Sequence, residues 1–148
     1  MKNRLKNEQK RMKKFSNIDS VMTKILKTMR KAIINMNKDQ MYEMGVMDRN
    51  NPSAILHYAP STIKNKKSRA KFPRTDHITL KWSGDFHKSL KIKYEDDGFL
   101  IFSEDEKWKA YLEPQYVFEN ALGLTDESLS LLREWVRDEL IKRFKYAI

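Results

Sequence analysis

The chain has 148 residues, 40% of them hydrophobic, which allows one domain with a real core and is too short for two comfortable domains. Its 30 basic and 20 acidic residues give a formal charge of +10, which favours nucleic acid, an acidic protein face or a membrane surface as a partner. The chain has no cysteine, so disulfides and thiolate metal sites are excluded. No apolar run reaches the roughly 20 residues of a membrane span, and no apolar segment follows the basic N-terminus. We therefore expect a soluble protein that is not exported through a secretory signal.

Residues 1–15 form a basic arm with few apolar side chains. The arm has seven bases and a single acid, Glu8. Two interpretations are open: a solvated terminus, or an arm that becomes ordered against an anionic partner.

Apolar residues then recur at alternating spacings of four and three, which predicts an amphipathic helix over roughly Ile18–Asn37. Ser16 or Asp19 can cap its first turn. The repeating positions are Ile18, Met22, Ile25, Met29, Ala32 and Met36. The stripe is broad enough for a globular core, and its methionines would also suit an interface with another subunit.

A long basic loop is predicted over about 48–76, because Gly45 and the Asp48–Pro52 cluster break the helical pattern. A short helix after Pro60, around 61–64, is the only regular element expected in it. Its bases, with no acid between residues 64 and 74, are Lys64, Lys66, Lys67, Arg69, Lys71 and Arg74. A loop of this length is usually functional or locally disordered. It lacks the interleaved aromatic residues of a single-strand binder.

The clearest strand signals lie between residues 77 and 103. Polar and apolar residues alternate over 78–82 and again over 90–94, the period of a half-buried strand. Residues 96–98, Asp-Asp-Gly, form a turn sequence, and the apolar run over 99–102 supplies a returning strand. These features predict a β-hairpin.

An acidic patch is predicted at the hairpin ends. It comprises Glu95, Asp96, Asp97, Glu104, Asp105 and Glu106. The patch and the basic loop could attract one another within a subunit or across a subunit boundary. A divalent cation could bind the first three acids, although a charged hairpin tip explains them without a ligand.

Aromatic residues over 108–118 should pack an irregular or short helical segment onto the sheet. Thr125 then caps a C-terminal helix whose apolar face is Leu129, Leu132, Val136, Leu140 and Phe144. The predicted fold class is therefore α+β, with N-terminal and C-terminal amphipathic helices packed on a small antiparallel sheet built around a β-hairpin. Residues 16–148 would form its single domain.

No catalytic, cofactor-binding or metal-binding signature is present. The histidines His57, His77 and His87 do not have metal-ligand spacing, and no glycine-rich phosphate loop exists. Asp85 and His87 could pair as acid and base, but no nucleophile or oxyanion site accompanies them. We expect a protein that is not an enzyme. A small metal-dependent nuclease using the acid cluster and His87 is the enzymatic alternative.

Three segments resemble a family of tailed-bacteriophage proteins, the tail-completion or head–tail connector (virion morphogenesis) proteins. They are Tyr58–Lys64, Leu80–Leu90 and Leu122–Glu127. The middle segment is similar to the family pattern of leucine, two residues, Thr/Ser-Gly, one residue, an apolar residue, two residues and serine. With the leading helix, the resemblance covers roughly residues 18–145.

The resemblance implies a structural, non-enzymatic subunit that forms a homo-oligomeric ring in the virion neck or at the top of the tail, after assembly in the host cytoplasm. Its partners would be portal or adaptor and tail proteins, without a membrane. The bases of the loop would face DNA in the ring lumen or a neighbouring subunit. The arm would dock on neighbours through Lys2, Arg4, Lys6, Lys10 and Arg11. The alternative function is a free-standing, sequence-nonspecific nucleic-acid-binding protein.

Overall fold

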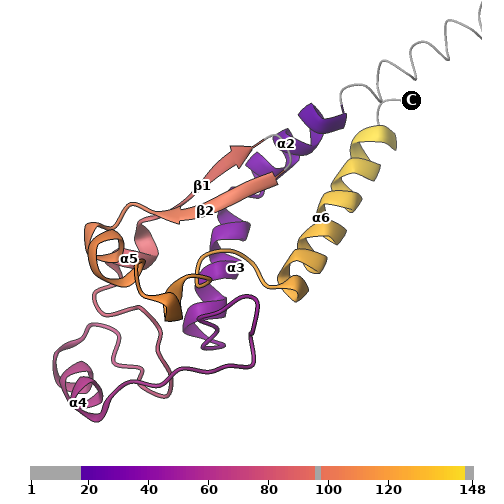
Figure 1. Cartoon of the computed structure of the whole chain (residues 1–148). Helices are drawn as coiled ribbons and strands as arrows, with labels where there is room; N and C mark the ends of the chain where they lie inside the picture. Colours follow the sequence, from indigo (N-terminus) through magenta and orange to yellow (C-terminus); the bar gives the residue numbers. More distant parts are fainter. Residues whose placement is uncertain (1–17, 96–97, 146–148) are drawn as a thin grey trace, which may run out of the picture.

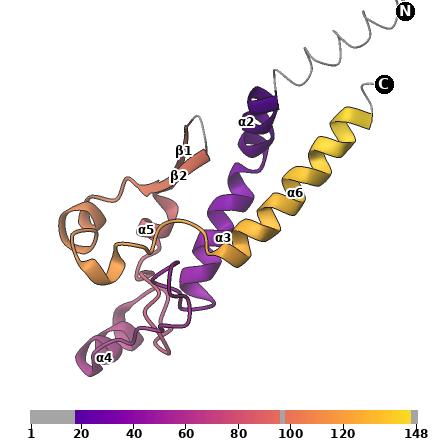
Figure 2. The ribbon, with the colours of Figure 1, turned by 45° about the vertical axis from the view of Figure 1, so that its right-hand side comes forward.

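The structure is a computed structural model that describes residues 18–95 and 98–145 (Figure 1). Helices and one two-stranded antiparallel sheet make up the described part of the chain, so the predicted α+β class is confirmed. A helical column and the C-terminal helix flank the sheet, whereas the segment around α4 lies at the far end of the molecule in both views (Figures 1 and 2).

The helical column consists of α2 (Ile18–Thr28) and α3 (Arg30–Tyr42), which follow one another with a bend at Met29. The Met29 N–H still donates to the Ile25 carbonyl at 3.1 Å, so helical hydrogen bonding continues through the bend. The Thr28 hydroxyl donates to the same carbonyl at 2.7 Å, a competing bond of the kind that bends helices. The single helix predicted over Ile18–Asn37 is therefore present as two helices separated at Met29, and α3 ends five residues beyond Asn37.

The predicted hairpin is formed by β1 (Leu90–Glu95) and β2 (Gly98–Ser103). Leu90 lies opposite Ser103 and Glu95 opposite Gly98. Every second side chain of a strand points to the same face, so the hairpin has one apolar face. This face packs on the helices. The core cluster between sheet and helices contains Ile25, Ile33, Ile92, Ile101, Leu124, Leu132 and Val136.

The prediction of a strand over 78–82 is wrong, because backbone N–H and C=O groups of this segment form hydrogen bonds with side chains and not with another strand. The Thr79 N–H donates to the Tyr58 hydroxyl at 2.9 Å, and the Thr79 carbonyl accepts from His87 Nε2 at 2.8 Å. Leu80 has a φ of 51°, in the left-handed region that strands do not use. The segment instead forms irregular chain beside α5 (Asp85–Lys88).

The aromatic segment folds into two short turns, the π-helical η1 (Trp108–Leu112) and the 3₁₀-helical η2 (Tyr116–Phe118). Trp108 and Phe118 are buried in a second core cluster with Met41, Met47, Phe86, Leu90 and Ala121. The prediction of an irregular or short helical segment over these residues is thus confirmed.

The C-terminal helix, α6 (Asp126–Lys145), lies alongside α2 (Figures 1 and 2). Thr125 caps it as predicted, since the Ser128 N–H donates to the Thr125 hydroxyl at 3.3 Å. Leu132 and Val136 are the residues of α6 that are buried in the core.

Two buried amides join α3 to the chain that leads into α6. Asn37 donates to the Ala121 carbonyl at 3.0 Å and accepts from the Gly123 N–H at 3.1 Å. Gln40 donates to the Gly123 carbonyl and accepts from the Thr125 N–H, both at 3.1 Å. Gly123 has a φ of 117°, which residues with a Cβ rarely adopt. We call these four bonds the amide clamp.

Replacing Asn37 by alanine should lower the free energy of unfolding by about 2–4 kcal/mol, because it leaves the buried carbonyl of Ala121 and the partly buried N–H of Gly123 without partners. Urea denaturation followed by circular dichroism measures this loss. Asn35→Ala is the matched control: Asn35 is exposed on the same helix, so the change should stay within about 0.5 kcal/mol. Equal losses in the two variants would contradict the clamp.

Candidate interaction surfaces

The predicted basic loop contains a full helix, α4 (Pro60–Arg69), which is longer than the short helix expected there. Lys66, one of the bases predicted to face DNA or a neighbour, is 1% exposed, which corrects its predicted role. Its Nζ donates to the carbonyls of Phe72 and Lys81 and lies 5.5 Å from the ring centroid of Tyr58. Burial lowers the pKa of Lys66, and the charge of Asp76 raises it in part. Lys66 therefore ties α4 to the chain behind it.

Arg74, the last base of the predicted set, is also engaged within the chain. Its guanidinium donates to the Tyr42 carbonyl at 2.9 Å, to a Glu43 carboxylate oxygen at 2.7 Å and to an Asp76 carboxylate oxygen at 3.0 Å. The two carboxylates compensate its charge, so Arg74 contributes little to an outward basic surface.

Four predicted bases are exposed on or just after α4, at the end of the molecule far from α6 (Figure 1). They are Lys64, Lys67, Arg69 and Lys71. The predicted docking residues of the N-terminal arm, Lys2, Arg4, Lys6, Lys10 and Arg11, lie outside the described residues. The structure thus reduces the predicted basic surface of the loop to four side chains.

The described acids do not form one patch, so that prediction is wrong for them. Glu95 lies beside the turn, whereas Glu104 follows the open end of the hairpin. Five residue steps of about 3.3 Å place the two ends roughly 17 Å apart. Each acid also has a basic partner on β1: Lys93 Nζ lies 3.4 Å from Glu95, and Lys91 Nζ lies 2.7 Å from Glu104.

Two further acids of the predicted patch, Asp105 and Glu106, are among the described residues. The Asp105 side chain accepts from the N–H of Trp108, the first residue of η1, at 2.8 Å. Glu106 is exposed beside it. Asp96 and Asp97 lie outside the described residues.

Asp85 and His87 do not pair as acid and base. The Asp85 carboxylate accepts from the Ser83 hydroxyl at 2.6 Å, whereas His87 is 4% exposed and donates from Nε2 to the Thr79 carbonyl. Burial lowers the pKa of His87 to about 4, although its hydrogen bond to Thr79 raises it in part. The nearby ammonium groups of Lys81 and Lys38 lower it further.

A basic groove that was not predicted from the sequence lies along the helical column. Lys27, Arg30, Lys31 and Lys38 line a hollow of about 450 Å³ beside the start of β1. None of the four forms an ion pair with another described residue. The signal was partly available, because the chain has no acid between residues 20 and 38, and three of the four bases, at 27, 31 and 38, fall on one side of a helix.

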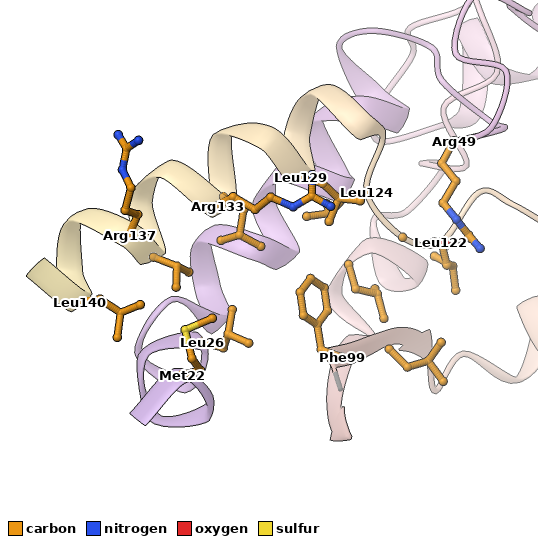
Figure 3. A pocket seen from close by; sticks show the side chains of 16 residues that line it. Met22, Leu26, Arg49, Phe99, Leu122, Leu124, Leu129, Arg133, Arg137 and Leu140 are labelled. Atoms are coloured by element: carbon orange, nitrogen blue, oxygen red, sulfur yellow. Dashed lines mark hydrogen bonds between the residues drawn. The ribbon is translucent and has the colours of Figure 1, made fainter. Parts of the chain in front are cut away.

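A second groove of about 580 Å³ lies between α6, α2 and β2 (Figure 3). Apolar side chains from all three elements line it, Met22 and Leu26 of α2 and Phe99 of β2 among them. Two arginines of α6, Arg133 and Arg137, stand at its rim, and the Arg137 guanidinium points outward, away from Met22 and Leu140 (Figure 3). No acid lines it. We call it the α6 groove.

The outer side of α6 also carries exposed apolar side chains. Leu131 is 42% and Trp135 37% exposed, and their spacing of four residues makes them neighbours on the helix surface. Leu132 and Val136, one position further along, are buried. The helix thus has apolar residues both toward the core and toward solvent.

Comparisons of the chain with protein-family models, with curated proteins and with solved structures find no match. Within residues 18–95 and 98–145, no group of three or more metal-ligating side chains is arranged to hold an ion. In the same part of the chain no helix is both long and apolar enough to cross a membrane.

His87 should make stability depend on pH. Its pKa is about 4 in the folded chain, against an ordinary value of 6.5, so the unfolded chain binds the extra proton more readily. The contribution to stability is therefore fully present above pH 6.5 and is lost as the pH falls toward 4. Between pH 7 and 4.5 the loss from this group should be about 2 kcal/mol.

Urea unfolding of the wild type and His87→Gln at the two pH values measures the effect. The glutamine amide can still donate to Thr79 but does not titrate, so the variant should lose about 2 kcal/mol less than the wild type on acidification. His57→Gln, at an exposed histidine, is the control and should follow the wild type. Identical pH profiles for His87→Gln and the wild type would rule out this role.

Proposed function

We propose that the chain is a structural subunit of a tailed-phage virion, which forms a ring at the neck or at the top of the tail and joins the portal side of the head to the tail. The resemblance of the segments over 58–64, 80–90 and 122–127 to connector proteins supports this role. In such a ring, each subunit covers part of its neighbour.

The apolar outer side of α6 is the observation that carries the proposal. Exposed, adjacent large apolar side chains such as Leu131 and Trp135 are typical of surfaces that another protein covers. Tryptophan is also enriched among residues that dominate interface energies. A ring neighbour would bury this side of the helix.

Particles of the phage that encodes the chain should contain it in a fixed, small multiple per portal, as quantitative mass spectrometry of purified particles measures. Leu131→Glu/Trp135→Glu should reduce its copies in particles at least tenfold, because charge on this side of α6 opposes burial against a neighbour. Ser130→Glu, at an exposed polar site of the same helix, is the control. Absence of the wild-type chain from particles would end the connector proposal.

Sequence-nonspecific nucleic-acid binding is the second candidate function, and the basic groove favours it. Four bases with no ion-pair partner among the described residues line one hollow on the helical column. Lysine and arginine side chains bind DNA by neutralising phosphates and releasing counterions, independently of sequence. The same contacts could occur with DNA in a ring lumen or in a free-standing protein.

Two matched triple variants can locate this interface. Lys27→Gln/Lys31→Gln/Lys38→Gln should lower the affinity for a 20-base-pair duplex about tenfold at low salt and reduce the salt slope by about three. Lys64→Gln/Lys67→Gln/Lys71→Gln removes the same charge from α4 and its flank and should change affinity less than threefold. A larger effect from the second triple would assign the interface to α4, and equal effects would indicate attraction by net charge alone.

A further inference from the structure

The strand β2 has a free edge. Hydrogen-bonded and non-hydrogen-bonded pairs alternate along an antiparallel ladder. The Glu104 N–H donates to the Ser89 carbonyl at 3.2 Å, and the register of the hairpin places these two residues opposite each other. Ser89 and Glu104 are thus a hydrogen-bonded pair, and every second pair of the hairpin from there is hydrogen-bonded as well. The backbone N–H and C=O groups of Phe99 and Ile101 therefore point away from β1. In the described part of the chain, no strand or side chain pairs with these outward groups.

This free edge borders the α6 groove. Phe99, Leu100 and Ile101 line the groove as consecutive residues, and Figure 3 shows Phe99 across from Leu129 of α6. The volume of about 580 Å³ falls within the range of roughly 300–1,000 Å³ that is common for ligand pockets. A peptide that adds a strand to a sheet needs unpaired backbone groups for its main-chain hydrogen bonds, which give affinity. It also needs pockets for its alternate side chains, which give specificity, and the free edge beside the apolar groove offers both.

The charges at the rim indicate the composition of the occupant. Arg133 forms no ion pair with a described residue, and Arg137 has only a loose pair with Asp138 at 3.7 Å, next to it in sequence. Both guanidinium groups are thus available to carboxylates of a partner. The chain's own arm, residues 1–15, has seven bases and one acid, so the rim would repel it.

We propose that the α6 groove binds an extended acidic peptide segment of a partner protein, which adds a third strand to the free edge of β2. Alternate apolar side chains of the segment enter the groove, and its acids pair with Arg133 and Arg137. This inference does not depend on the connector role, since it rests on the strand edge, the groove and the rim.

A fluorescein-labelled ten-residue peptide of alternating valine and glutamate is the probe, and fluorescence polarisation with the full chain is the measurement. The peptide should bind saturably, and the same peptide with lysine in place of glutamate should bind at least tenfold more weakly. Arg133→Glu/Arg137→Glu should weaken binding at least tenfold. Lys142→Glu/Lys145→Glu makes the same charge change at exposed sites of α6 outside the groove and should change it less than threefold.

Backbone pairing is tested separately with two N-methylated peptides. Because only every second N–H of an added strand faces β2, methylation of either the valine or the glutamate amides should abolish binding, and methylation of the other set should be tolerated. Equal losses from both sets would overturn strand addition. Absence of saturable binding, equal binding of the lysine peptide, or equal effects of the two double variants would overturn the acidic-peptide assignment. A change in solution mass caused by Arg133→Glu/Arg137→Glu alone would assign the groove to a second copy instead.

Discussion

The amide clamp is the constraint on which the rest of the structure depends. Asn37 and Gln40 are buried, so their side chains must find partners inside the protein, and they find them in the backbone of residues 121–125. This backbone leads directly into α6. These four hydrogen bonds therefore set the orientation of α6 relative to α3. The orientation of α6 in turn sets the width of the groove between α6 and β2.

Positive charge is divided between internal and external roles. Lys66 and Arg74 are bonded to backbone carbonyls, which orders the segment between α3 and α5 without a strand or a large core of its own. The helical column is divided in the same way. Met22 and Leu26 of α2 face the α6 groove, whereas Lys24 of α2 and Lys31 of α3 lie on the opposite side of the column. The helical column thus supplies an apolar wall on one side and a basic face on the other.

The candidate surfaces were only partly predictable. The charge pattern of the sequence identified the bases of the loop. It could not show that Lys64 is exposed and Lys66 buried, because both belong to the same basic run. The predicted acidic patch failed since acids close in sequence lie at opposite ends of a hairpin once the strands pair. The α6 groove had no local signal at all, because its walls come from segments about 75 and 110 residues apart.

By itself, the sequence determined the elements whose cause is local. The period of the apolar residues specifies the two long helices, alternation around Asp-Asp-Gly specifies the hairpin, and Thr125 specifies where α6 begins. Tertiary structure decided what depends on distant partners: the irregular path over 78–82, the internal role of Lys66, and the free edge of β2. The physical reason is that a buried polar group forms a hydrogen bond with whichever partner the fold brings within about 3 Å. The spacing of residues along the sequence does not show which distant groups come that close.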